Sequence, residues 1–205
     1  MEQLGNNVAV EDSQQILRPA TMEWVDVAGL AKGAHRGEGL GNQFLGTLRT
    51  CTALCHVVRI FADTNVVHVD GAVDPVSDVT AINLELILAD LAQVERRLER
   101  ATCDGLERET LERIAVSLNK GKMPPSQEFS KEQLLSIKSM GLLTLKPMLY
   151  AFNVDENDFL DPSPGTLEQV QAVLDSENDS HIHGDTVYAF VSSKLESEIA
   201  ELDDT

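Results

Sequence analysis

The stretch of residues 25–45, VDVAGLAKGAHRGEGLGNQFL, constrains the fold more than any other part of the chain. It begins as an apolar run that, with residues 21–25 leading into it, predicts a buried strand. Asp26 stands at the carboxyl end of this strand, Gly29 follows three residues later, and a glycine-rich loop precedes a helical pattern that resumes at Asn42. These features, in this order, predict a crevice at the carboxyl edge of a parallel sheet, where open α/β sheets bind ligands.

Asp26 and Gly29 are residue types that suit a phosphate site. A carboxylate can hold Mg²⁺ through water, and the amide of Gly29 can approach a terminal phosphate because no Cβ intervenes. The four-residue pattern Asp-x-x-Gly is common by chance, so it gains its meaning only from the longer stretch around it.

The longer stretch resembles the switch II region of the Obg-like ATPase (YchF) family, a branch of the P-loop GTPases. The likeness covers most of residues 18–202 and continues through these segments: 56–61 (HVVRIF), 68–78 (HVDGAVDPVSD), 85–91 (ELILADL), 153–156 (NVDE) and 191–202 (VSSKLESEIAEL). It implies an α/β fold, an incomplete P-loop NTPase G domain of the Ras-like or Obg type with a mostly parallel sheet. It also implies a helical hairpin inserted at about residues 77–140. The implied activity is binding and slow hydrolysis of ATP with Mg²⁺, GTP being the poorer ligand, in contact with ribosomes or other translation components.

One motif of such a domain is missing from the 205 residues. The phosphate loop reads G-x-x-x-x-G-K-[S/T], and its amides and lysine hold the phosphates. The only Gly-Lys pair is Gly121-Lys122, which Met123 follows. We therefore expect residues 1–205 to form a partial G domain, without the phosphate loop and without the C-terminal TGS domain of the family. Two hypotheses stay open: a nucleotide-binding ATPase, and a non-enzymatic fragment that only binds a protein or the ribosome. The missing motif favours the second for this chain taken alone.

Residues 153–156, Asn-Val-Asp-Glu, stand where guanine-specific loops read Asn-Lys-x-Asp. Glu156 replaces the aspartate that pairs with guanine, and Val154 replaces the lysine, which weakens guanine selection. The resemblance implies adenine preference instead, with Asn153 and the backbone of Val154 facing the base. It assigns the final nucleotide loop to Ser192, Ser193 and Lys194.

The residue after Asp-x-x-Gly bears on catalysis. In Ras-like enzymes a glutamine there positions the attacking water, whereas Leu30 has no hydrogen-bonding group. The resemblance makes His35 the catalytic candidate for that polar role, since a histidine in a glycine-flanked loop can orient water at neutral pH. A loop histidine that makes only a structural hydrogen bond is the alternative.

Composition limits the partners and the compartment. The net charge of −18 argues against coating DNA, and the chain has no run of about 18 apolar residues that would predict a membrane span. Cys51, Cys55 and Cys103 form no metal-ligand quartet and are predicted to be buried free thiols. Free thiols favour a reducing compartment, either the cytoplasm or an organelle stroma or matrix.

Periodicity predicts the remaining elements. Apolar runs at residues 53–61, 146–152 and 186–191 predict parallel strands. Residues 77–100 carry a heptad seam, Asp104-Gly105 breaks it, and a second seam follows, which predicts an antiparallel helical pair. Residues 94–122 hold seven Lys/Arg against six Asp/Glu, so this segment is the least repelling face for RNA. A solvated helix laced with salt bridges is the favoured interpretation of that segment.

Overall fold

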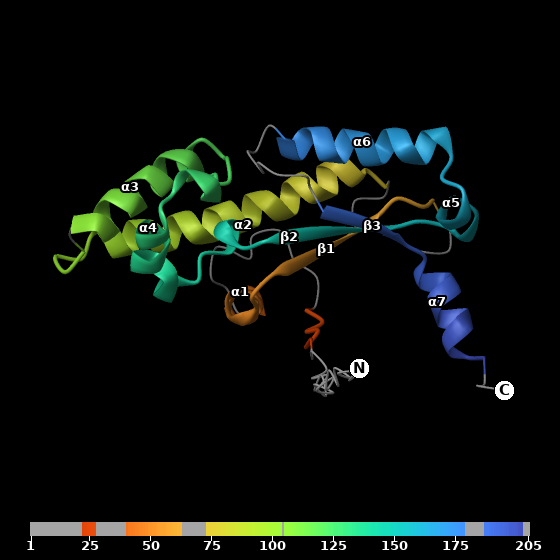
Figure 1. The fold of residues 1–205 in the computed structure, drawn as a ribbon, viewed down its shortest axis with the longest axis horizontal. Helices are drawn as coiled ribbons and strands as arrows, with labels where there is room; N and C mark the ends of the chain where they lie inside the picture. Colours follow the sequence, from red (N-terminus) through yellow and green to blue (C-terminus); the bar gives the residue numbers. More distant parts are fainter. Residues whose placement is uncertain (1–21, 28–39, 63–72, 104, 179–186, 203–205) are drawn as a thin grey trace, which may run out of the picture.

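A computed structural model describes residues 22–27, 40–62, 73–103, 105–178 and 187–202. In these residues the sheet has three strands, β1 (Leu54–Arg59), β2 (Met148–Asn153) and β3 (Val187–Val191), in the order β1-β2-β3. Both pairings are parallel, with Val57 beside Ala151 and Ala151 beside Ala189 (Figure 1). The α/β fold class and the three predicted strands are therefore confirmed.

Helices connect and flank these strands. Their bounds are α1 (Leu40–Thr50), α2 (Pro75–Leu98), α3 (Gly105–Asn119), η2 (Ser126–Glu128), α4 (Lys131–Ile137), η3 (Lys138–Met140), η4 (Leu143–Leu145), α5 (Glu156–Leu160), α6 (Pro164–Asn178) and α7 (Ser193–Ala200). Asp74 starts α2 by accepting a hydrogen bond from the Ser77 amide at 3.1 Å, and Pro75 occupies the first turn, where a missing N–H costs nothing.

Helices α2 and α6 cover one face of the sheet (Figure 1). Val79 of α2 and Val173 of α6 pack with Tyr150 and Phe152 of β2, and all four side chains are fully buried. The aromatic side chains of β2 thus form the centre of this cluster, which fixes the strand that ends at Asn153.

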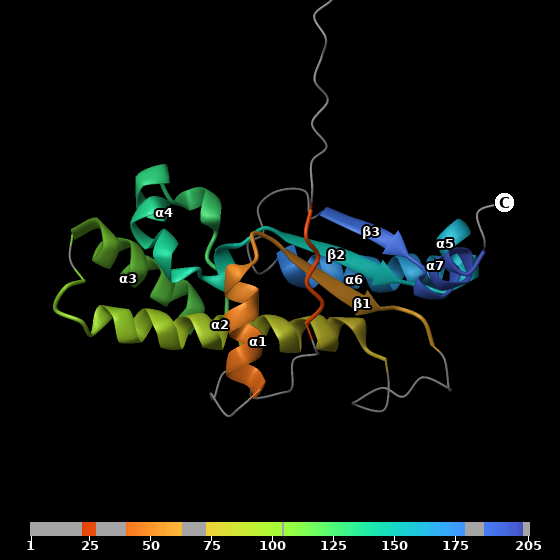
Figure 2. The ribbon, with the colours of Figure 1, turned by 90° about the horizontal axis from the view of Figure 1, so that it is seen from below.

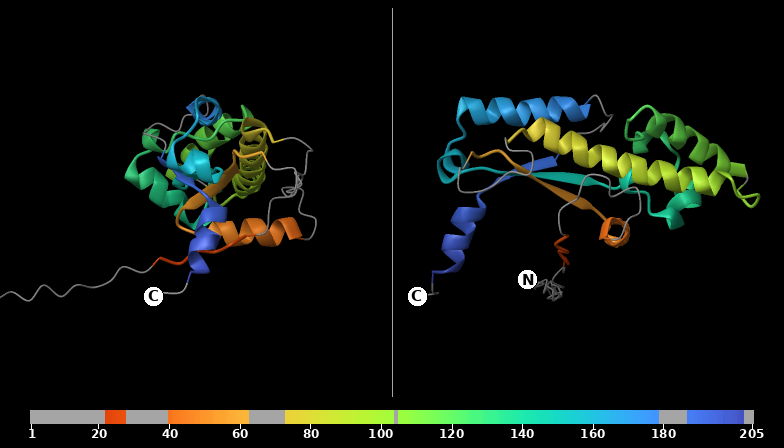
Figure 3. Two further views of the ribbon diagram at one scale, coloured as in Figure 1. Left: turned by 90° about the vertical axis from the view of Figure 1, so that its right-hand side faces the viewer. Right: turned by 180° about the vertical axis from the view of Figure 1, so that it is seen from behind.

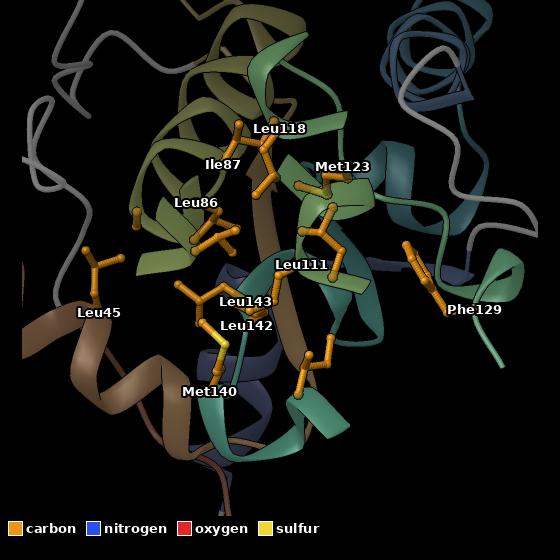
Figure 4. Packing of buried hydrophobic residues seen from close by; sticks show 14 of the residues in the cluster. Leu45, Leu86, Ile87, Leu111, Leu118, Met123, Phe129, Met140, Leu142 and Leu143 are labelled. Atoms are coloured by element: carbon orange, nitrogen blue, oxygen red, sulfur yellow. The ribbon is translucent and has the colours of Figure 1, made fainter. Parts of the chain in front are cut away.

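The second half of α2 leaves the sheet and packs against α3 and η4, and α4 packs against α3 (Figure 3, right). Leu86 and Ile87 of α2 meet Leu111 and Leu118 of α3, and Leu143 closes the cluster from η4 (Figure 4). The predicted helical pair is therefore present, with Ile87 and Val94 of the first helix and Leu111 and Leu118 of the second buried in one cluster.

Among the described residues, no helix covers the opposite face of the sheet between α1 and α7 (Figure 2). Val57 is 64% exposed and Val187 is 63% exposed, although parallel strands are usually covered on both faces. The prediction of a buried thiol was wrong for Cys55, which lies on this open face, whereas Cys103 is buried and Cys51 half-buried. The expected strand at residues 21–25 was also wrong for its described part, because residues 22–27 pair with no described strand and are mostly exposed.

No helix in the described ranges is both long enough and apolar enough to cross a membrane.

His56 gives the fold a testable pH dependence. Its ring lies 5.6 Å from the ring of Tyr150, its Nδ1 atom has no hydrogen-bond partner among the described residues, and burial lowers its pKa to about 4, which nearby Asp78 only partly opposes. Between pH 6.5 and 4, His56 is therefore protonated in the unfolded chain but neutral in the folded chain. We expect the His56 contribution to the free energy of unfolding to fall by about 3 kcal/mol as the pH drops through this window.

The measurement is urea unfolding of the wild type and of His56→Phe from about pH 7.5 to about pH 4, which spans the two pKa values. The difference between the two proteins isolates His56 from the titration of the many carboxylates. Parallel pH profiles for the two proteins would contradict the expectation.

Candidate nucleotide-binding site

The carboxyl ends of β2 and β3 bring two predicted site loops together. Asn153 is the last residue of β2 and lies beside Val191, the last residue of β3. Ser192 follows, is 1% exposed, and caps α7 by accepting a hydrogen bond from the Leu195 amide at 3.5 Å. The order strand, cap and helix therefore holds residues 192–194 next to Asn153.

The side chain of Asn153 and residue Ser193 form a reciprocal pair. The Asn153 Nδ2 group donates to Ser193 Oγ at 3.0 Å, and the Ser193 amide donates to Asn153 Oδ1 at 3.1 Å. An amide side chain has two N–H donors and two acceptor positions, so one donor and one acceptor position remain for a ligand. The pair fixes the plane of the Asn153 amide, as a base-recognition group requires.

Glu156 and Lys194 form an ion pair across the same two loops. Lys194 Nζ lies 2.5 Å from Glu156 Oε1, and Glu198 lies 3.9 Å from the same nitrogen. Both side chains of the closer pair are partly exposed, so the pair adds little to stability. The pair matters for the site because Glu156 stands where guanine-specific loops carry the aspartate that binds guanine, and its carboxylate is already paired with Lys194.

Val154 and Asp155 fix the loop that follows β2, residues 153–156. The Val154 amide donates to the Val191 carbonyl at 2.9 Å, and Val154 is 3% exposed. Asp155 caps α5 by accepting from the amides of Asn157 and Asp158 at 2.8 and 3.0 Å. A contact between the backbone of Val154 and a base stays a prediction.

Of the predicted switch residues, the structure describes only Asp26. Asp26 is exposed and makes no hydrogen bond or ion pair with another described residue, while Gly29, Leu30 and His35 lie outside the described residues. Mg²⁺ takes near-octahedral oxygen ligands, and the described ranges contain no group of three or more His, Cys, Asp or Glu that could hold a metal. The described residues therefore form no all-protein magnesium cage, whereas a single carboxylate such as Asp26 fits a magnesium ion that is held mainly by the phosphates of a bound nucleotide.

Two features of the site were not predicted from the sequence. The Glu156–Lys194 pair and the helix-capping role of Asp155 were not expected. An aspartate directly before a short helix is a cap signal that could have identified Asp155. The ion pair joins residues 38 positions apart (194 − 156) and has no local signal.

Comparison with known proteins identifies relatives along nearly the whole chain, although no family model matches it. The Ribosome-binding ATPase YchF of Bacillus subtilis is 41% identical over 194 residues, 90% of this chain and 51% of the relative. The protein of the same name from Haemophilus influenzae is 43% identical over 194 residues, 91% of this chain and 51% of the relative.

A solved structure agrees with these sequence relatives. The Schizosaccharomyces pombe YchF GTPase superimposes with a TM-score of 0.66 at 31% identity, over 85% of this chain and 48% of that one. The chain thus spans about half the length of the relatives it matches, and over that part it belongs to the YchF family.

Proposed function

We propose that this chain binds an adenine nucleotide at the carboxyl edge of its sheet and associates with the ribosome. The observation that carries the first part is the reciprocal Asn153–Ser193 pair, which holds an amide ready for a base. The second part follows from relatives named ribosome-binding ATPases. Ribosome association would place the protein in the cytoplasm, or in the stroma or matrix of an organelle.

The chemistry of the two loops favours adenine over guanine. Ser193 occupies the edge of the Asn153 amide that carries an acceptor and a donor together, so the remaining N–H and lone pair point in different directions and one of them at a time is proposed to reach a nitrogen acceptor or the amino group of adenine. Guanine would instead need the Glu156 carboxylate, and Lys194 holds that group at 2.5 Å. GTP is therefore proposed as the poorer ligand.

Hydrolysis is a separate proposal. Asp26, Gly29 and His35 are the residues proposed to act at the phosphates, with Asp26 linked to Mg²⁺ through water and His35 orienting the attacking water. When bound, Mg²⁺ would neutralise phosphate charge, and in this chain it would be held largely by the phosphates of ATP itself. Because phosphoryl transfer depends on positioning and charge, and the 205 residues lack the phosphate-loop motif, we propose that this polypeptide alone does not turn over ATP.

Asn153→Ala is expected to weaken binding of fluorescently labelled ATP about tenfold, because it removes the base-facing amide and leaves Ser193 without its partner. Titration of the fluorescence gives the dissociation constant, and competition with unlabelled ATP and GTP gives the selectivity. Asn119→Ala is the matched control, since the Asn119 side chain bonds only within its own helix, to the Ala115 carbonyl.

Equal ATP affinity of Asn153→Ala and the wild type would contradict base recognition by Asn153. Phosphate release by the wild type that is lost in His35→Ala would contradict the absence of turnover. Co-sedimentation with ribosomes in the absence of any ATP binding would favour the second hypothesis, a binding module without nucleotide.

A further inference from the structure

Lys194 is a cation at the unfavourable end of its own helix. It is the second residue of α7, and the positive end of the helix dipole favours acids in this first turn and disfavours lysine. The backbone there is fixed, because Ser192 caps the helix and the Ser193 amide donates to Asn153 Oδ1 at 3.1 Å. A residue that breaks a local rule at such a fixed position has its explanation outside its own helix.

That explanation is Glu156, in the first turn of α5. Helices α5 and α7 both begin at the carboxyl end of the sheet (Figure 1). Lys194 Nζ lies 2.5 Å from Glu156 Oε1 but 3.9 Å from Glu198 Oε1, so the lysine is closer to the acid across the two loops than to the acid one turn along its own helix.

The carboxylate of Glu156 depends on this contact. Its Oε1 atom is shielded from solvent, and in the described part of the chain only Lys194 forms an ion pair with it. A carboxylate oxygen that water does not reach is costly to leave without an opposite charge. Lys194 therefore holds one oxygen of Glu156 in place.

The two purine bases differ at the edge that a carboxylate can bind. Guanine presents N1–H and an N2–H side by side, and these two donors match the two oxygens of a free carboxylate. Adenine presents the bare nitrogen N1 at the same place, and its lone pair repels a negative charge. A free carboxylate at position 156 would thus favour guanine, whereas a carboxylate with one oxygen already paired cannot make the bidentate contact.

We propose that Lys194 sets the base preference of this site by holding Glu156 away from guanine, which makes it a positioning residue for nucleotide selection. The proposal rests on the proposed function, because it requires a base to lie against the loops that Asn153 and Ser193 join. It adds that the preference for adenine does not come from Asn153 alone. A guanine contact that is withheld contributes as well, since selectivity is a difference between two affinities.

The test is competition against fluorescently labelled ATP by unlabelled ATP and GTP, with the full 205-residue chain. Lys194→Ala is expected to lower the ratio of ATP affinity to GTP affinity about fivefold, the upper value for an ion pair with exposed side chains. The ratio isolates the base, because both nucleotides carry the same triphosphate and any attraction of Lys194 for phosphate cancels. The Lys194 side chain is 73% exposed, so urea unfolding should be almost unchanged.

Three readouts separate positioning of Glu156 from a merely structural role. ITP lacks the 2-amino group of guanine, so Lys194→Ala should bind GTP at least about threefold more tightly than ITP, whereas the wild type should not distinguish them. Lys194→Arg should keep the wild-type ratio, because a guanidinium group also pairs with a carboxylate. Raising the salt from about 50 to about 500 mM should lower the ratio in the wild type but not in Lys194→Ala, because salt screens an exposed ion pair.

Two further variants serve as controls. Glu156→Ala/Lys194→Ala should show the same ratio as Glu156→Ala, because Lys194 acts through Glu156. Glu198→Ala removes the other acid near Lys194 and leaves the closer pair intact, so its ratio should stay within about twofold of the wild type.

The outcomes distinguish this proposal from the proposed function. ATP binding by the wild type with an unchanged ratio in Lys194→Ala would overturn the role of Lys194 and leave nucleotide binding intact. A fall in the ratio that is equally large in the Glu156→Ala background would also overturn it, because the lysine would then act directly on the nucleotide. Binding of neither ATP nor GTP by the wild type would refute the proposed nucleotide site, and the role of Lys194 with it.

Discussion

Replacing Asp90 with alanine is expected to lower the free energy of unfolding by about 3–5 kcal/mol, as when one partner of a buried ion pair is removed. Asp90 is fully buried, and its Oδ1 atom accepts from Arg49 Nη1 at 2.8 Å. Its Oδ2 atom accepts from both the amide and the hydroxyl of Thr144, each at 2.8 Å. One carboxylate therefore joins α1, α2 and η4.

The cost is large because three donors lose their acceptor at once. The Thr144 amide and hydroxyl would be left in a site that water does not reach, and each such donor carries a desolvation penalty of about 1–3 kcal/mol. Arg49 would keep only its bonds to the carbonyls of Gly141 and Ala89, at 3.1 and 3.4 Å.

The measurement is urea unfolding at about pH 7, with Asp90→Asn beside Asp90→Ala. The introduced asparagine side chain keeps acceptor capacity but loses the charge opposite Arg49, so an intermediate loss is expected for Asp90→Asn. Glu112→Ala is the surface control, because the Arg108–Glu112 pair is 3.5 Å long and exposed, and its loss should cost less than about 1 kcal/mol. Similar losses in Asp90→Ala and Glu112→Ala would show that the buried network does not stabilise the fold.

Asp90 also shows what the sequence could have told us. It stands three residues after Ile87 and four after Leu86, on the apolar stripe of α2. An acid on such a stripe predicts a buried partner, but not which one. Arg49 and Thr144 lie 41 and 54 positions away, so only the packing of three elements identifies them.

Apolar periodicity correctly predicted the three strands and the helical pair, because the spacing of apolar residues reflects which side chains of an element are buried. It failed for Cys55, because the apolar pattern of β1 predicts a covered strand on either face, whereas in the described residues α2 and α6 cover only one. The site divides in the same way. Asn153 and Ser193 were predicted as site residues through the family likeness, whereas their mutual hydrogen bonds depend on the parallel register of β2 and β3.

The second large effect is expected at Phe152. Its side chain is fully buried in β2, with ring centroids 6.2 Å from Tyr150, 5.8 Å from Tyr188 and 6.3 Å from Phe190. Phe152→Ala would leave a cavity in the middle of this cluster, and the free energy of unfolding should fall by about 3–5 kcal/mol. Phe152→Leu retains most of the volume and should lose less.

The same substitution should loosen the proposed nucleotide site, because Asn153 follows Phe152 directly on β2. Urea unfolding measures the free energy of unfolding, and titration of the folded Phe152→Leu protein with labelled ATP measures the dissociation constant at the proposed site. Val57→Ala is the control: Val57 lies on the neighbouring strand but is 64% exposed on the open face, so its loss should stay within about 0.5 kcal/mol. If Val57→Ala proved as costly as Phe152→Ala, the face of the sheet that carries Val57 would have to be covered in solution, and a core on one side of the sheet alone would be excluded.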